Sequence, residues 1–271
     1  MEDERYLKIV AGLAYECSIV NRVEVESLSR LYREPSLEGI RELHGRLIDS
    51  PDHRRREVAI WLEPALELGP IGTPPEQLAR EMREMEFILL ILTRKAGEVW
   101  RTVNRWMDYI ANAAISLLQG YWIDAKIYLS RAVEASRSVE VEGLKRQPNL
   151  SYEIDILQRA TLSYFRELRR YPVRLSIPGG SMEPLLLVQA VLLEMMEDSY
   201  LRGVGGKPLR ESIHRLSSAV RHLMAEGGAS RAEGEIRRVV EDLPLIEREG
   251  VRGERIEDYR MRLLEAVRAL P

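Results

Sequence analysis

Apolar side chains recur at steps of three and four residues along almost the whole chain, which is the spacing of a helix that buries one face. Proline, glycine and capping residues divide this pattern into segments. The predicted helices cover approximately residues 3–33, 36–48, 50–64, 74–119, 122–145, 151–170, 185–200, 208–225, 230–249 and 254–270. No stretch alternates with the period of two that a half-buried strand requires. We therefore expect an all-α fold, a bundle of about nine or ten helices with no substantial sheet.

Two segments are apolar enough to form the centre of this bundle. Residues 87–92 are apolar on every side of the helix predicted over 74–119, so we expect them to be buried all round. Residues 185–196 form the second very apolar stretch. Capping-box patterns at Thr73–Glu76 and Ser230–Glu233 predict where two of the helices begin.

The clearest linker is the segment 68–75, which is rich in glycine and proline. It divides the chain into an N-terminal helical segment, residues 1–70, and a main helical domain, residues 71–271. The N-terminal segment either folds separately or packs as part of the main body. The longest uncharged apolar stretch, 109–123, is 15 residues, shorter than the roughly 20 of a membrane span. The start of the chain is acidic, unlike a secretory signal. We expect a cytoplasmic protein without membrane association.

Composition excludes several classes of protein. The hydrophobic content of 45% suits a buried core, and the single cysteine rules out an internal disulfide and a cysteine-based zinc site. Only five of the 40 basic residues are lysine, and only four residues are asparagine. This bias is typical of a protein from a hot habitat, although a GC-rich genome also favours arginine. The net charge of −3 does not indicate a nucleic-acid coat protein but leaves local basic patches open.

The segment 120–132, Gly-Tyr-Trp-Ile-Asp-Ala-Lys-Ile-Tyr-Leu-Ser-Arg-Ala, resembles the second helix of a tetratricopeptide repeat. In that family, small residues at the positions of Ala125 and Ala132 and a larger one at Leu129 let two helices approach closely. The resemblance covers one helical hairpin, and no second copy follows at the repeat length of about 34 residues. It implies a protein interface at Ala125, Leu129 and Ala132. The alternative is an ordinary antiparallel helix pair.

Arg215 and His222 have six residues between them, which resembles the Arg-(four to six)-His element of the HEPN family of helical ribonucleases and nucleotide-modifying proteins. In that family the arginine stabilises phosphate charge and the histidine transfers protons near neutral pH. Arg46 and His53 repeat the same spacing, with Pro51 between them. The resemblance implies catalysis by Arg215 and His222, and the alternative is a surface or interface histidine.

Metal and cofactor motifs are incomplete. Glu211 and His214 have the spacing of one half of a ferritin-like di-iron site, but no second half exists. Glu194, Glu197 and Asp198 crowd one predicted helix end, as Mg²⁺ ligands would, without a matching acidic cluster. Phosphate-binding loops and nucleophile elbows are absent from the sequence. We expect no metal and no cofactor.

Arg54, Arg55 and Arg56 fall in the first turn of the helix predicted after Ser50 and Pro51. Cations there oppose the helix dipole, at a cost of a few tenths of a kcal/mol each. Such local inconsistency marks either tertiary ion pairing or a binding surface. If they face solvent, these arginines predict binding to nucleic-acid phosphate or to an acidic partner.

These observations favour a non-catalytic helical interaction protein that binds a protein partner, nucleic-acid phosphate, or both through an arginine-rich patch. A HEPN-like enzyme that uses Arg215 and His222 is the first alternative, and a helical carrier of a metal or small ligand is the second. A protein partner is the main expectation. Nucleic acid and a homodimer remain open.

Overall fold

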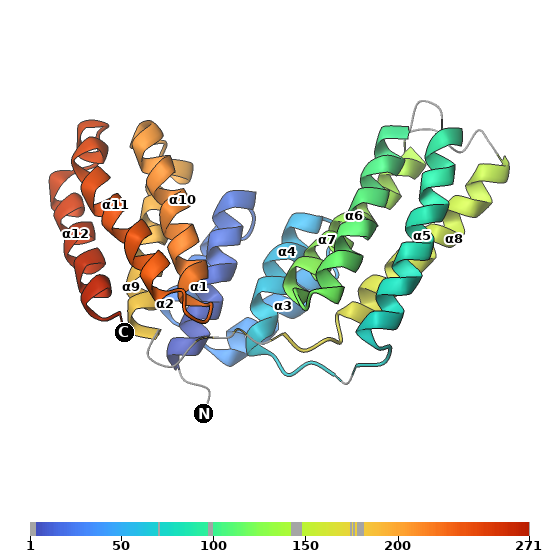
Figure 1. Cartoon of the computed structure of the whole chain (residues 1–271), viewed down its shortest axis with the longest axis horizontal. Helices are drawn as coiled ribbons and strands as arrows, with labels where there is room; N and C mark the ends of the chain where they lie inside the picture. The colour runs from blue at the N-terminus through green and yellow to red at the C-terminus, as the bar shows by residue number, and fades with distance from the viewer. Residues whose placement is uncertain are drawn as a thin grey trace. The chain divides into compact units, whose positions relative to one another are not determined.

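The computed structural model describes residues 4–69, 71–96, 100–141, 148–173, 175, 177 and 182–270. Among these residues all regular structure is helical, and it comprises twelve α-helices and two short helical turns, η1 and η4 (Figure 1). The predicted all-α class is confirmed. The predicted number of nine or ten helices is wrong, because two segments predicted as single helices each form two.

The first of these segments is residues 3–33, which form α1 (Glu4–Asn21) and α2 (Val25–Arg33). No glycine or proline marks the break. Instead Arg22 and Glu24 take positive φ angles of 56° and 54°, and the Ser18 side chain donates a hydrogen bond to the Val23 carbonyl at 2.6 Å. The second segment is residues 74–119, which form α5 (Pro75–Lys95) and α6 (Trp100–Leu118), packed against each other.

The chain divides into two compact units. We call residues 1–41 and 174–271 the terminal unit, and residues 42–173 the central unit. Helix α3 (Leu37–Ile48) crosses the boundary between them. The linker at 68–75 lies inside the central unit, and separate folding of residues 1–70 stays a prediction.

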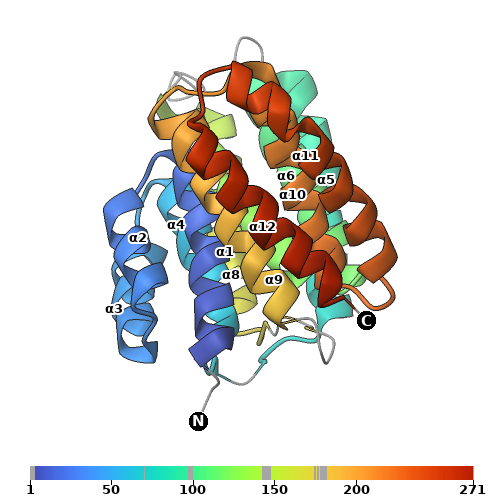
Figure 2. The same cartoon turned by 90° about the vertical axis from the view of Figure 1, so that its left-hand side faces the viewer.

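The terminal unit is built around α9 (Met182–Met196), which contacts α1, α10 (Gly206–Leu223) and α12 (Gly253–Arg268). Figure 2 shows α12 lying across α9, with α1 beside it. Helix α11 (Ala229–Arg248) packs between α10 and α12, and α2 packs on α1. Leu185, Val188 and Leu192 of α9 are completely buried, as the sequence predicts for residues 185–196. After α9 the chain continues as the π-helical turn η4 (Glu197–Leu201).

The central unit contains α4 (His53–Leu62), the turn η1 (Glu63–Ala65), α5, α6, α7 (Trp122–Val141) and α8 (Pro148–Leu168). Helix α6 packs against α5 and α7, and α7 also packs against α4 and α8. The buried Trp106 of α6 donates a hydrogen bond from Nε1 to Thr161 of α8 at 3.1 Å.

Fewer helices begin at a capping side chain than the sequence predicts. Ser36 accepts a hydrogen bond from the Gly39 amide at 3.1 Å and begins α3 as predicted. The cap of α4 is Asp52, whose side chain accepts a hydrogen bond from the Arg54 amide at 3.0 Å, so the helix begins at His53, later than the predicted residue 50. Neither predicted capping box forms, since the cap positions of α5 and α11 are Pro74 and Gly228.

The prediction that residues 87–92 are buried on every side is wrong. Only Leu89 and Leu92 are buried, whereas Phe87, Ile88, Leu90 and Ile91 are 63%, 45%, 42% and 42% exposed. The reason is that α5 packs against α6 and α8 through one face, and no described residue covers the opposite face. No helix in the described part of the chain combines the length and hydropathy needed to cross a membrane.

Candidate anion-binding pocket

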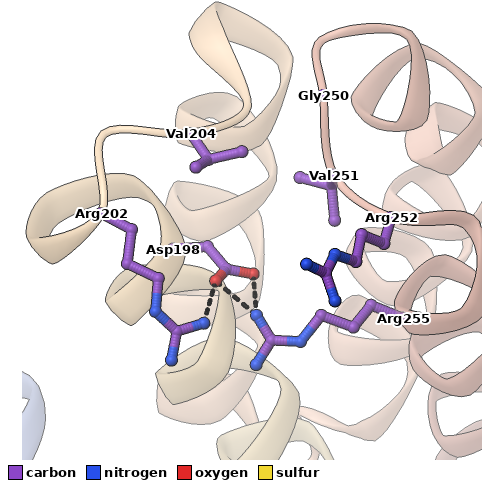
Figure 3. Close-up of a pocket in the computed structure, with 7 residues that line it drawn as sticks. All are labelled: Asp198, Arg202, Val204, Gly250, Val251, Arg252 and Arg255. Atoms are coloured by element: carbon purple, nitrogen blue, oxygen red, sulfur yellow. Dashed lines mark hydrogen bonds and ion pairs between the residues drawn. The ribbon is translucent and has the colours of Figure 1, made fainter.

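A pocket of about 520 Å³ opens in the terminal unit, where the end of α9 and η4 meets the start of α12 (Figure 3). Its walls come from η4 and the loop after it, from the turn between α11 and α12, and from the first turn of α12. The lining residues are Asp198, Arg202, Val204, Gly250, Val251, Arg252 and Arg255.

Two backbone features shape this pocket. In η4 the Arg202 amide reaches back to the Glu197 carbonyl at 3.0 Å, the five-residue step of a π turn, and such turns recur at functional sites. Gly250 has a φ of 99°, a conformation that other residues rarely adopt, and it reverses the chain from α11 into α12. Together they bring Asp198 and Arg252 to one cavity from opposite sides (Figure 3).

Asp198 is the buried centre of the site, only 3% exposed. Its Oδ1 accepts a hydrogen bond from Arg202 Nη1 at 2.7 Å, and its Oδ2 accepts one from Arg255 Nη1 at 2.5 Å. The Tyr259 hydroxyl donates to Oδ2 at 3.2 Å. Burial, reinforced by the negative charge of Asp198, raises the pKa of Tyr259, so this hydroxyl remains a donor. The carboxylate is therefore fully engaged by three donors.

The three arginines of the pocket outnumber the two carboxylates that pair with them, Asp198 and Glu197. Burial opposes the Arg255 charge, but Tyr259 and Asp198 outweigh this effect and raise its pKa. Arg202 is shared between Asp198 and Glu197, whose Oε2 lies 3.7 Å from Arg202 Nη2. Arg252 is exposed and projects into the same cavity, and it forms no ion pair with any residue that the structure describes (Figure 3). The pocket therefore has an excess of positive charge.

The helix that begins at the pocket adds to this potential. Arg252 is the N-cap residue of α12, and its side chain forms no capping hydrogen bond. The start of α12 therefore has no capping side chain of its own, although Glu247 Oε1 lies close to Gly253, and the positive end of the helix dipole at the pocket favours a bound anion. Val204 and the buried Val251 supply an apolar wall beside the charged groups.

The acidic half of this site stands out in the sequence as Glu194, Glu197 and Asp198, but the arginines that pair with it do not. The carboxylates suggested as Mg²⁺ ligands are occupied by arginines, with Glu194 bound by Arg262 at 2.8 and 2.9 Å and Asp198 bound by Arg255. The arginines of residues 252–255 were missed. Their signal was present, because Arg252 is a cation at a helix N-terminus, the same inconsistency that singled out residues 54–56.

Arg54, Arg55 and Arg56, in the first turn of α4, do not all face solvent. Arg56 is 3% exposed, donates to Ser130 Oγ at 2.9 Å, and has its pKa lowered by burial to about 10. Arg54 is exposed and paired with Asp52 at 3.1 Å, and Arg55 is exposed. Tertiary pairing therefore explains Arg56, and binding by Arg54 and Arg55 stays a prediction.

Arg215 and His222 both lie on α10, but their contacts are separate. Arg215 lies 3.5 Å from Glu235 and 3.9 Å from Asp242, both on α11. His222 Nε2 lies 3.4 Å from the hydroxyl oxygen of Ser218. The HEPN-like assignment stays a prediction.

Ala125, Leu129 and Ala132 of α7 are all completely buried. Helix α7 packs against α4, α6 and α8 of the central unit. These three side chains therefore contribute to the packing of the chain itself, and a protein interface at them stays a prediction.

A smaller pocket of about 230 Å³ lies in the central unit, lined by His53, Thr102, Arg105, Tyr109, Arg131, Glu134, Ala135 and Ser138. Glu134 Oε2 accepts hydrogen bonds from the backbone amide of His53 at 2.8 Å and from its Nδ1 at 2.7 Å. Asp52, His53 and Glu134 lie close enough to share a metal ion. However, Asp52 already caps α4 and Glu134 already binds His53, so the geometry fits an internal hydrogen-bond network better than a cation site.

Comparisons with protein-family models, with curated proteins and with solved structures find no match for this chain.

Proposed function

We propose that the protein is a non-catalytic helical binding protein, and that its terminal-unit pocket holds the phosphate group of a small ligand. The observation that carries this proposal is the exposed Arg252, which has no ion pair among the described residues and sits beside Arg255 at the start of α12. Guanidinium groups bind phosphate oxygens in a two-pronged geometry, and a helix N-terminus supplies further favourable potential.

Size and composition support a small ligand over a reaction centre. A volume of about 520 Å³ falls in the range of small-molecule sites. None of the seven lining residues is a histidine, cysteine, serine, threonine or lysine, so a nucleophile with its base is missing from the wall. Asp198 is engaged by Arg202, Arg255 and Tyr259, which leaves it poorly placed to accept a proton from a substrate.

This proposal keeps the small-ligand carrier considered from the sequence and replaces residues 54–56 with residues 202, 252 and 255 as the arginine-rich patch. Single-stranded nucleic acid carries the same phosphate group. The test therefore includes a short RNA as a separate arm.

Isothermal titration of the full chain with inorganic phosphate, pyrophosphate and a nucleoside monophosphate tests the proposal. Arg252→Glu reverses the unpaired charge, and we expect it to weaken binding at least about tenfold because one charge-assisted contact becomes repulsive. The matched control is Arg268→Glu, at the opposite end of α12 and also exposed, which should leave binding unchanged.

Two results would overturn the proposal. Binding that is equally affected by Arg252→Glu and Arg268→Glu would place the phosphate elsewhere. Binding of RNA alone, with no binding of the three small phosphates and with a steep dependence on salt, would indicate an extended nucleic-acid surface instead of this pocket.

A further inference from the structure

The outer face of α5 carries an apolar surface in addition to the apolar stripe that packs against the core. Phe87, Ile88, Leu90 and Ile91 are 63%, 45%, 42% and 42% exposed. The opposite stripe of α5, which includes Met82, Met85, Leu89 and Leu92, is buried. Four large apolar side chains clustered within two turns are unusual on a surface and mark an interaction site.

The helical positions of this face follow the pattern of a coiled-coil seam. Glu84, Phe87, Ile91 and Arg94 are separated by three, four and three residues, and all four are exposed. At 100° per residue they fall within an arc of about 80° on the side away from the core. Ile88 and Leu90 flank the seam at the positions that border a partner helix in a coiled coil.

The charges at the two ends of this seam are opposite. Glu84 lies before the apolar positions and Arg94 lies after them, and neither forms an ion pair with a residue that the structure describes. Their neighbour Arg83 differs, because it pairs with Glu86 of the same helix at 2.7 Å. Each end of the seam thus presents one charge of defined sign to a partner.

This arrangement fits a second copy of the same chain in antiparallel orientation. A two-fold axis at residue 89 places Phe87 opposite Ile91 of the other copy. Glu84 and Arg94 each lie about 7.5 Å along the helix from that axis, so each meets the opposite charge of the partner. A parallel pairing would instead oppose like charges at both ends. We infer that the protein forms a homodimer through the outer face of α5, which is a self-complementary surface.

The available area sets the expected strength of this dimer. The four apolar side chains offer on the order of 350 Å² per copy, less than the roughly 800 Å² that each partner buries in a standard interface. The flanking charges and polar side chains must supply the remainder. We therefore expect a reversible dimer that dissociates on dilution.

Sedimentation velocity of the full chain over a concentration series measures this equilibrium. Glu84→Arg and Arg94→Glu should each weaken the dimer by about tenfold, since each single variant places like charges opposite one another. The double variant Glu84→Arg/Arg94→Glu should restore it to within a few-fold. An equimolar mixture of the two single variants should form a mixed dimer, because one chain is basic and the other acidic at both ends of the seam.

Phe87→Glu should abolish dimerisation, and Met261→Glu, at a residue of α12 that is 58% exposed, is the matched control that should not. Circular dichroism of each variant checks that the fold is kept. A wild-type chain that stays monomeric at every concentration would overturn the inference, as would a dimer that is insensitive to Phe87→Glu. Equal dissociation constants for the single and double charge variants would exclude the antiparallel arrangement.

Discussion

Each unit buries a carboxylate that pairs with a cation, and the two clusters differ in whether solvent reaches the cation. In the central unit, Lys126 Nζ lies 2.5 Å from Glu63 Oε2 and donates to the Tyr171 carbonyl at 2.8 Å. The side chains of Lys126 and Glu63 are 0% and 1% exposed. In the terminal unit, the Asp198 side chain is 5% exposed, but those of Arg255 and Arg202 are 33% and 53% exposed.

A buried charge therefore does not by itself mark a binding site. The Lys126–Glu63 pair is sealed from solvent, with His44 Nε2 3.4 Å from the second Glu63 oxygen, and no described pocket opens on it. Burial lowers the pKa of Lys126, and Glu63 partly offsets that effect. Asp198, by contrast, anchors arginines whose remaining donors face a cavity. An excess of cations with access to solvent is what distinguishes the proposed binding pocket from the structural pair.

The largest expected loss of stability comes from removing the cation of the buried Lys126–Glu63 pair. Lys126→Met leaves the Glu63 carboxylate buried without its cation, which should lower the free energy of unfolding by about 3–5 kcal/mol. Urea denaturation followed by circular dichroism measures it. The double variant Lys126→Met/Glu63→Gln removes the orphaned charge and should recover most of the loss. A single-variant loss below about 1 kcal/mol would contradict the sealed environment.

The second prediction concerns Asp198, whose substitution should lower the stability of the fold and raise the affinity for phosphate. Asp198→Asn removes the carboxylate charge from the arginines, but Arg202 and Arg255 retain access to water. We therefore expect a smaller loss of stability, about 1–3 kcal/mol. The same change leaves the pocket more positive and should tighten phosphate binding. Urea denaturation and calorimetric titration of the same variant measure both effects.

The control for Asp198→Asn is Asp258→Asn. Asp258 binds Arg262 outside the pocket and its side chain is 50% exposed. It should change neither stability nor affinity appreciably, because exposed ion pairs contribute little. Weaker phosphate binding by Asp198→Asn would mean that the carboxylate positions the arginines more than it neutralises them.

Burial could be predicted from the sequence for one of the two most apolar helices but not for the other. Periodicity predicts both 185–196 and 87–92 as buried, which is correct for α9 and wrong for most of the α5 segment. The pattern reports which faces of a helix are apolar, but not whether another element covers them. The predicted helix caps were wrong for a related reason. The Thr73 amide, predicted to lie in a capping box, is bound at 2.7 Å by Glu167, which is distant in the sequence.

The pocket was harder to predict than the fold class because it joins residues about 50 positions apart. Asp198 and Arg255 meet only because α12 packs on α9, and no short motif encodes that contact. The local signals identified unusual charges correctly, but not their partners. Arg56 and Arg252 both oppose a helix dipole, yet one is buried against Ser130 and the other faces a cavity.

The smallest expected change in stability concerns a third carboxylate, that of Glu16, which forms no ion pair with a lysine and no bidentate contact with an arginine among the described residues. Glu16 of α1 accepts a hydrogen bond from the Ser217 hydroxyl at 2.5 Å, with Arg221 nearby. Burial raises the pKa of Glu16 in spite of both groups. The folded state therefore binds this proton more tightly than the unfolded state. Its contribution is most favourable at acidic pH and is lost as the pH rises through the raised folded value.

Glu16→Gln keeps the acceptor for Ser217 and removes the titration. At neutral pH the variant should be more stable than the wild type by less than about 1 kcal/mol, because the penalty of burying an ionised carboxylate is gone. The difference should shrink as the pH falls toward the usual carboxyl pKa of about 4.3. Urea denaturation at a series of pH values measures it. A variant that is less stable at neutral pH would mean that Arg221 more than offsets burial, so that Glu16 would belong with Glu63 and Asp198 as a carboxylate matched by its cation.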